Sequence, residues 1–202
     1  MELLGGRAKM AAKLDSLLSM PSTTVVGGYG HMIHEMREVE FAKMGQYAHV
    51  NEPDHHLLYF YNHVRQPWKT QASVRRVMDE LYDQDGMIGD EDTGQMSAWY
   101  IFNATGFYPF CPGSPNYLIG SPLFAETTIH LTRGKSFVVR ARNNSPRNRY
   151  IQSARLNGKP FTKTWLSHDT ITAGGVLEFE MGGEPNKQWG SAEADAPPND
   201  FP

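Results

Sequence analysis

The spacing of apolar residues changes in the middle of this chain, and that change limits the possible folds more than any other feature. Up to residue 106 the apolar side chains recur every three or four positions, the spacing of one face of an α-helix. A turn-rich stretch, YPFCPGSP, follows at residues 108–115, and beyond it short apolar runs lie between Gly, Asn and Pro. The sequence therefore predicts an α+β fold with helices first and an antiparallel β region second.

The individual elements follow from the same periodicity. Helices are predicted at residues 7–18, 31–44, 55–64, 71–82 and 94–104. Strands are predicted at TTIHL, KSFVVRAR, YIQSARL and VLEFEM, with hairpin turns at residues 132–135 and at Asn157-Gly158. We place a helical domain at residues 1–112, a β-rich module at 113–190 and a disordered, proline-rich tail at 191–202.

Composition excludes several classes of partner. The 202 residues carry a net charge of −3 with no run of Lys or Arg, so nucleic acid is not an expected partner. No apolar stretch approaches the roughly 20 residues of a membrane-spanning helix, and the first twenty residues lack the order of regions found in a signal peptide. Cys111 is the only cysteine, which rules out an intrachain disulfide and a cysteine-based metal cluster.

Two polar segments precede aromatic helices and carry most of the candidate chemistry. The first, HVNEPDHH at residues 49–56, is here called the histidine loop. Asn51, Glu52 and Asp54 offer the hard oxygen ligands that calcium prefers, and His55 and His56 offer hydrogen bonds to sugar hydroxyls. The alternative is a helix-capping loop in which Asp54 accepts from the first helical N–H groups.

The second segment, GDEDTGQ at residues 89–95, is here called the acidic loop. Its three consecutive carboxylates repel one another, which favours protonation, metal binding or use as a base at one of them. An acidic cap on the following helix remains the alternative. An EF-hand is excluded, because a loop counted from Asp83 puts Ile88 at the position of the turn glycine and Gly94 at that of the bidentate Glu.

Other catalytic motifs find no support. His31 and His34 lie three positions apart, yet HMIHE is neither the H-E-x-x-H zinc motif nor its inverted form, and a packing or hydrogen-bonding role is the simpler interpretation. The chain contains no G-x-S-x-G elbow, no P-loop and no G-x-G-x-x-G fingerprint. Acyl transfer, phosphoryl transfer and dinucleotide binding are therefore not indicated.

Taken in order, these segments resemble a known family. The stretches from GYGHMIHEM to WKTQ, from GDEDTGQMSAWYIFNATGFYPFCPGSP to SPLF, YIQSARLNGKP and PNKQWG are similar to the C-terminal region of glycoside hydrolase family 92. The resemblance spans residues 1–190 and implies an inverting, calcium-dependent exo-α-mannosidase that acts on mannose-containing glycans. It also implies that the helices here form the last part of an (α/α)6 barrel.

The resemblance assigns roles to particular residues. Asp92 matches the general base and Asp90 assists it, while Asn51 and Glu52 fall in the calcium-binding segment. His49, His55 and Trp99 are expected near the sugar. In an inverting enzyme the base activates water on the face of the sugar opposite the leaving oxygen.

One departure from the family pattern limits the expected activity. The family's general acid is a Glu in an EGN-type motif upstream of this region, and the chain contains no such motif. We therefore expect an incomplete active site that needs the missing N-terminal part of the enzyme, or that self-associates, and secretion or a periplasmic location is expected by resemblance alone. The alternatives are a non-catalytic carbohydrate-binding or structural remnant and a helical-repeat interaction protein.

Overall fold

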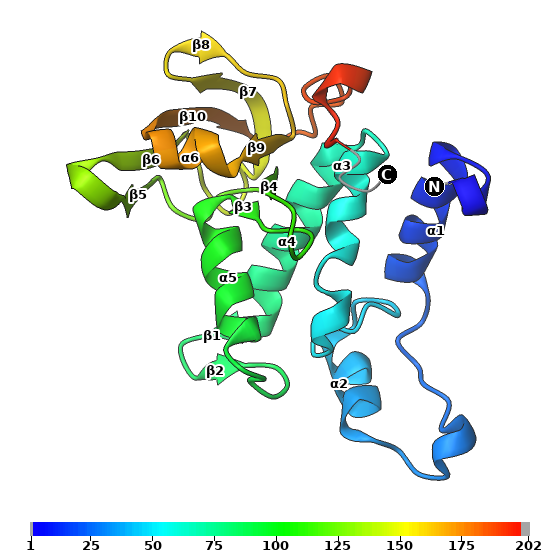
Figure 1. Cartoon of the computed structure of the whole chain (residues 1–202). Helices are drawn as coiled ribbons and strands as arrows, with labels where there is room; N and C mark the ends of the chain where they lie inside the picture. Colours follow the sequence, from blue (N-terminus) through cyan, green and yellow to red (C-terminus); the bar gives the residue numbers. More distant parts are fainter. Residues whose placement is uncertain (1, 199–202) are drawn as a thin grey trace.

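A computed structural model describes residues 2–198 of the chain. Most of the helices occupy one end of the molecule, and two β-sheets occupy the other together with the short helix α6 (His168–Ala173) (Figure 1). Helix α5 (Gln95–Thr105) runs from the helical end toward the sheets. The predicted α+β class is confirmed. No helix within the described residues has the length and apolar character needed to cross a membrane.

The helices begin and end close to the positions that local sequence signals predict. The α-helices are α1 Arg7–Ser19, α2 His34–Ala42, α3 Phe60–His63, α4 Pro67–Leu81, α5 Gln95–Thr105 and α6 His168–Ala173. Pro67 opens α4, where its missing N–H costs nothing. Gly106 closes α5 with a left-handed φ of 108°, a conformation that glycine adopts readily.

The helix predicted at residues 55–64 is the least accurate of the five. It is a 3-10 turn at Leu57–Tyr59 followed by the short α3. Leu58, Tyr59, Tyr61 and Asn62 are all buried, so this segment has no exposed face and no amphipathic repeat to sustain one long helix.

The main sheet has five strands in the order β5-β6-β10-β7-β8. These strands are β5 Glu126–His130, β6 Ser136–Arg142, β10 Gly175–Gly182, β7 Tyr150–Leu156 and β8 Lys159–Pro160. The prediction of a purely antiparallel module is wrong at one pairing, because β10 runs parallel to β6. A long connection separates those two strands, and only a tight hairpin would have forced them to be antiparallel.

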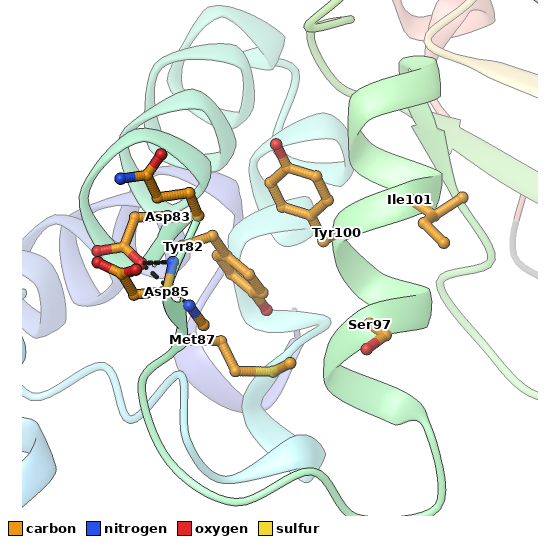
Figure 2. A pocket seen from close by; sticks show the side chains of 9 residues that line it. Tyr82, Asp83, Asp85, Met87, Ser97, Tyr100 and Ile101 are labelled. Carbon is orange, nitrogen blue, oxygen red and sulfur yellow. Dashed lines mark hydrogen bonds between the residues drawn. The ribbon is translucent and has the colours of Figure 1, made fainter.

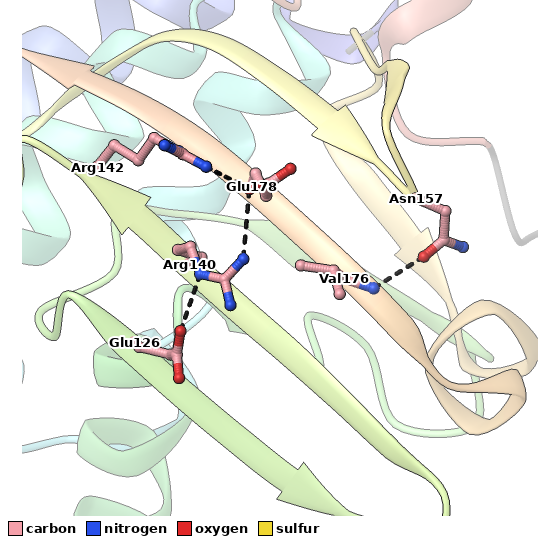
Figure 3. Close-up of polar contacts among 6 residues, drawn as sticks. All are labelled: Glu126, Arg140, Arg142, Asn157, Val176 and Glu178. Carbon is pink, nitrogen blue, oxygen red and sulfur yellow. Dashed lines mark hydrogen bonds and ion pairs between the residues drawn. The ribbon is translucent and has the colours of Figure 1, made fainter.

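Both predicted hairpin turns are confirmed. β5 and β6 pair antiparallel across the 3-10 turn Thr132–Gly134. Asn157 and Gly158 join β7 to β8 with φ values of 50° and 78°, as a two-residue turn of this type requires. The Asn157 side chain also accepts a hydrogen bond of 2.8 Å from the backbone N–H of Val176 on β10 (Figure 3).

The outer face of the main sheet carries an ion-pair ladder. Arg140 on β6 donates to Glu126 on β5 at 2.8 Å and lies 3.4 Å from Glu178 on β10, which also accepts from Arg142 at 3.0 Å (Figure 3). Facing residues of opposite charge stabilise neighbouring strands. This face is therefore explained as a solvated sheet surface.

A smaller sheet joins the helical end to the main sheet. Its strands are β3 Phe107–Tyr108, β4 Asn116–Ile119 and β9 Trp165–Ser167, in the order β3-β4-β9. β3 belongs to this sheet although it precedes residue 112, the predicted end of the helical domain. Phe102 of α5 packs against both the helical core and the sheet core, so the two parts share a continuous apolar interior.

Part of the predicted disordered tail lies against the body of the protein. Ser191 accepts a hydrogen bond of 2.7 Å from Arg65, and the backbone of Asp195 accepts one of 2.9 Å from Thr164. The tail has too few apolar side chains to pack against the protein, and hydrogen bonds to its backbone hold it in place instead. The structure differs here from the expected disorder over residues 191–198, and residues 199–202 lie outside the described part.

Candidate active site

The histidine loop and the acidic loop open onto one cavity of about 1050 Å³. Glu52 of the first loop and Asp92 of the second both line it. The other lining residues are Pro53, His56, Thr93, Gln95, Ala98, Phe102, Tyr108, Pro109, Phe110 and Pro112. The two loops are therefore neighbours in space, as a shared site requires.

His49 anchors the histidine loop in the protein interior. Its side chain is 1% exposed, its Nδ1 lies 2.9 Å from the Tyr47 hydroxyl and its Nε2 lies 2.7 Å from the Tyr82 hydroxyl. Burial lowers the pKa of His49 well below its ordinary value, so the ring is neutral at pH 7. A neutral ring has one donor and one acceptor nitrogen, and the two hydroxyls serve both.

His55 folds back under the same loop. Its Nε2 donates to the His49 carbonyl at 2.8 Å, and its ring stacks on that of His49 with centroids 4.6 Å apart. Burial lowers the pKa of His55 as well. The two rings therefore form a neutral pair that ties both ends of the loop together.

Trp99 on α5 completes this buried group. It is fully buried, with its ring edge-on to His49 at 4.4 Å and parallel to Tyr82 at 5.9 Å. His49, His55 and Trp99 thus lie behind the cavity wall, and none of the three lines it.

The acidic loop is held mainly by its middle carboxylate. Glu91 accepts hydrogen bonds of 3.0 Å from the backbone N–H groups of Met96 and Ser97, and one from the Ser97 hydroxyl. These bonds, the Ser97 hydroxyl first among them, lower the pKa of Glu91. Glu91 therefore fills the capping role that was the alternative interpretation of this segment. Asp90 and Asp92 are left exposed to solvent.

The candidate calcium ligands differ in their surroundings. Glu52 is half-buried in the cavity wall, whereas Asn51 is exposed and its side chain hydrogen-bonds that of Asp54. Burial raises the pKa of Asp54. Among the residues that the structure describes, no three His, Cys, Asp or Glu side chains converge on one point. The donor chemistry suits calcium, but these side chains are fewer than the roughly six to eight oxygen ligands that the ion takes.

His34 lies beside two carboxylates of its own helix, α2. Its Nε2 lies 3.2 Å from Glu35 and its Nδ1 lies 3.5 Å from Glu38. These local contacts agree with the simpler interpretation of the HMIHE segment.

A second, smaller cavity of about 690 Å³ lies on the other side of α5 and is drawn in Figure 2. Tyr82, Met87, Tyr100 and Ile101 line it beside the β1–β2 hairpin, formed by Tyr82–Asp83 and Gly86–Met87. Asp83 accepts from the backbone N–H groups of Asp85 and Gly86 at 2.8 and 3.1 Å. The carboxylate therefore closes the turn, as Asp commonly does.

Sequence reasoning missed several residues of the main cavity. Gln95 and Tyr108 line it and hydrogen-bond each other at 3.0 Å, and Phe110 lies in the same wall. His56, which the sequence did suggest as a hydrogen-bonding group, lies there as well. Gln95 is the last residue of the acidic loop, so its position in the sequence was an available signal. Tyr108 and Phe110 lie in the turn-rich stretch after α5, where no local pattern points toward a site.

Comparison with known proteins identifies the family of this chain. A family model described as the glycosyl hydrolase family 92 catalytic domain matches residues 1–183. The chain belongs to this family. Of the curated proteins, an "Uncharacterized secreted glycosidase" from Arthroderma benhamiae is 30% identical over 98% of the chain and 23% of its own length.

Solved structures of family 92 match nearly all of this chain. An inverting mannosidase of the family from Bacteroides thetaiotaomicron is 48% identical, with a TM-score of 0.82 over 97% of this chain and 27% of its own. An α-mannosidase of the family from the same organism, in complex with mannoimidazole, is 36% identical, with a TM-score of 0.85 over 96% of this chain and 25% of its own. The chain thus spans about a quarter of the length of these family 92 proteins.

Proposed function

We propose that this chain supplies the general-base side of the active site in an exo-acting, inverting α-mannosidase. The observation that carries the proposal is the cavity shared by Glu52 and Asp92, in a chain whose family 92 relatives include an inverting mannosidase. Asp92 is the proposed base because it is a solvent-exposed carboxylate in the cavity wall, where it can accept a proton from water. Asp90, two residues away, is proposed to assist it.

The buried aromatic group receives a supporting role in this proposal. His49, His55 and Trp99 were expected near the sugar, and we propose that they hold the histidine loop in place beneath it. Their burial favours this role over direct contact with a ligand.

We propose Asn51 and Glu52 as the part of a calcium site that this chain contributes. Backbone oxygens, water, sugar hydroxyls and residues outside this chain would complete the ligand set. When bound, calcium supplies a positive charge that polarises sugar hydroxyls and nearby water.

We propose that the rest of the enzyme covers the apolar surface of the helical end. Val25, Phe41 and Ile101 are 85%, 77% and 65% exposed, more than their side chains would be inside a closed helical barrel. This supports an incomplete (α/α)6 barrel that either joins the missing N-terminal part or self-associates. Secretion is proposed only because the Arthroderma benhamiae relative is described as secreted.

The test of the base uses a hybrid enzyme in which the 202-residue chain replaces the equivalent segment of the Bacteroides inverting mannosidase. Asp92→Asn keeps the shape of the site and removes the base, so kcat should fall about 10²- to 10⁴-fold with little change in KM. Glu80→Gln, on the exposed end of α4, is the matched control and should leave kcat unchanged. An Asp92→Asn hybrid with wild-type kcat would contradict the assignment.

The test of calcium uses the same hybrid with Asn51→Ala. Loss of one ligand should raise both KM and the calcium concentration that activity requires, because the contact is made in ground and transition states alike. An activity that survives exhaustive chelation in the wild-type hybrid would remove calcium from the proposal.

A third experiment measures the activity of the isolated chain. Without a general acid the leaving oxygen departs unprotonated, so mannose release should stay at background. Release by the isolated chain that Asp92→Asn abolishes would show that a local Glu serves as the acid. If the hybrid is inactive yet still binds mannosides, the non-catalytic, carbohydrate-binding alternative is favoured.

A further inference from the structure

A chain of hydrogen bonds runs from the buried histidine loop into the cavity. It begins where His55 Nε2 meets the His49 carbonyl oxygen at 2.8 Å. A carbonyl oxygen only accepts, so the proton of His55 is on Nε2 and Nδ1 of the neutral ring is an acceptor. Burial, which lowers the pKa of His55, keeps the ring neutral at pH 7.

That tautomer sets the orientation of the Gln95 amide. Gln95 Nε2 lies 3.3 Å from His55 Nδ1 and 3.0 Å from the Tyr108 hydroxyl oxygen. Only the amide nitrogen can donate to the His55 acceptor, so the alternative orientation of the amide would place two acceptors against each other. The two N–H groups of Gln95 are therefore directed at His55 and Tyr108.

The Tyr108 hydroxyl consequently has a proton left to donate. Its oxygen accepts from Gln95, and burial raises the pKa of Tyr108, so the phenol stays protonated. The ring is fixed by stacking on Tyr59 at 5.4 Å and by the edge of Phe102 at 6.4 Å. Gln95 and Tyr108 both line the main cavity.

We propose that Tyr108 and Gln95 form a hydroxyl-recognition pair in this cavity, in which Tyr108 donates a hydrogen bond to a ligand hydroxyl and Gln95 Oε1 accepts one. A sugar hydroxyl is both donor and acceptor and matches the pair, whereas a carboxylate or phosphate offers acceptors only and meets the negative charges of Glu52 and Asp92. His55 is a positioning residue, because it orients Gln95 from behind the wall. The inference rests on the proposed function and adds a specificity determinant to that cavity.

The test is Tyr108→Phe in the hybrid enzyme, with Michaelis constants measured for α-mannosides. The variant removes one hydroxyl and keeps the stacked ring, so KM should rise about 5- to 50-fold, the cost of leaving a ligand hydroxyl unpaired. Gln95→Glu should also raise KM, because the Tyr108 hydroxyl would then donate its proton to the carboxylate at position 95 and not to the ligand. The double variant should be no worse than the more severe single variant. Tyr100→Phe, whose hydroxyl lies outside this cavity, is the control and should leave KM unchanged.

A panel of monodeoxy mannosides separates recognition from mere bracing. The mannoside that lacks the hydroxyl contacted by Tyr108 should bind the wild type more weakly than the parent mannoside does. Tyr108→Phe should not reduce its affinity further, since the hydrogen bond is already absent. An unchanged KM for every substrate, with a lowered melting temperature alone, would show that the pair only braces α5 against β3. A wild type that binds another sugar in a Tyr108-dependent manner would keep the pair and overturn the mannoside assignment.

Discussion

The histidine loop and the acidic loop face the same cavity, yet they are held there in different ways. The histidine loop is anchored by two buried imidazole rings and by Trp99 beneath them. The acidic loop is exposed from Asp90 to Gly94, and the Glu91 carboxylate ties it to the start of α5. One loop is thus part of the core and the other is attached to a helix end, as the proposed function requires of a fixed ligand platform and a solvated base.

The largest expected effect tests whether the core supports the histidine loop. Trp99→Ala should destabilise the protein by about 3–5 kcal/mol, because it removes a fully buried ring that packs against both His49 and Tyr82. Ile101→Ala, two residues away and 65% exposed, is the matched control and should change stability by less than about 0.5 kcal/mol. Chemical denaturation measures the free energy of unfolding of both variants. Equal losses would contradict the claim that the histidine loop, unlike the acidic loop, is held by the core.

Trp99→Phe sharpens the same experiment. The Nε1 atom of Trp99 is buried and has no hydrogen-bond partner among the described residues. Replacing the indole by phenyl removes that unsatisfied donor, which offsets part of the packing loss. The variant should therefore be clearly more stable than Trp99→Ala in the same denaturation assay.

The next expected effect is a dependence of folding stability on pH that arises from His49 and His55 in the histidine loop. Burial lowers the pKa of His49 and of His55 below the ordinary value of 6.5. Below pH 6.5 the unfolded chain then binds more protons than the folded one, so folding stability is full above this pH and is lost as the pH falls. Each neutral histidine contributes a slope of up to about 1.4 kcal/mol per pH unit in that window.

Denaturation between pH 5 and pH 8 measures this slope. His55→Gln should reduce it, whereas His130→Gln, at an exposed position on β5, should leave it unchanged. A wild type with constant stability through this range would mean that the two rings are charged or accessible in the folded protein.

The smallest effect concerns the acidic loop. Glu91→Gln should lower the melting temperature slightly, because a neutral amide caps the α5 N-terminus less well than a carboxylate does. Asp90→Asn should leave the melting temperature unchanged or raise it, since it relieves repulsion between neighbouring carboxylates. Added salt should shrink the difference between the variants. If Asp90→Asn had the lower melting temperature of the two variants, Asp90 and not Glu91 would be the capping carboxylate.

Much of the fold followed from local signals. The apolar stripe of α4, the Gly106 cap of α5 and the Asn157-Gly158 turn each depend on residues close together in the sequence. The pairing of β6 with β10 depends on two strands far apart in the chain, and nothing local records its direction. The short α3 was misjudged because burial on all sides removes the periodicity that predicts helix length.

The site divides in the same way. The sequence by itself determined that the two loops contain carboxylates, amides and imidazoles and that each loop precedes an aromatic helix, because residue types and their order are read directly from it. Only the tertiary structure decided that Glu52 and Asp92 share a cavity, that the imidazoles lie beneath its wall, and that Gln95 and Tyr108 belong to it. Burial and contact between distant segments arise from packing, and they determine which polar side chains remain exposed to a ligand.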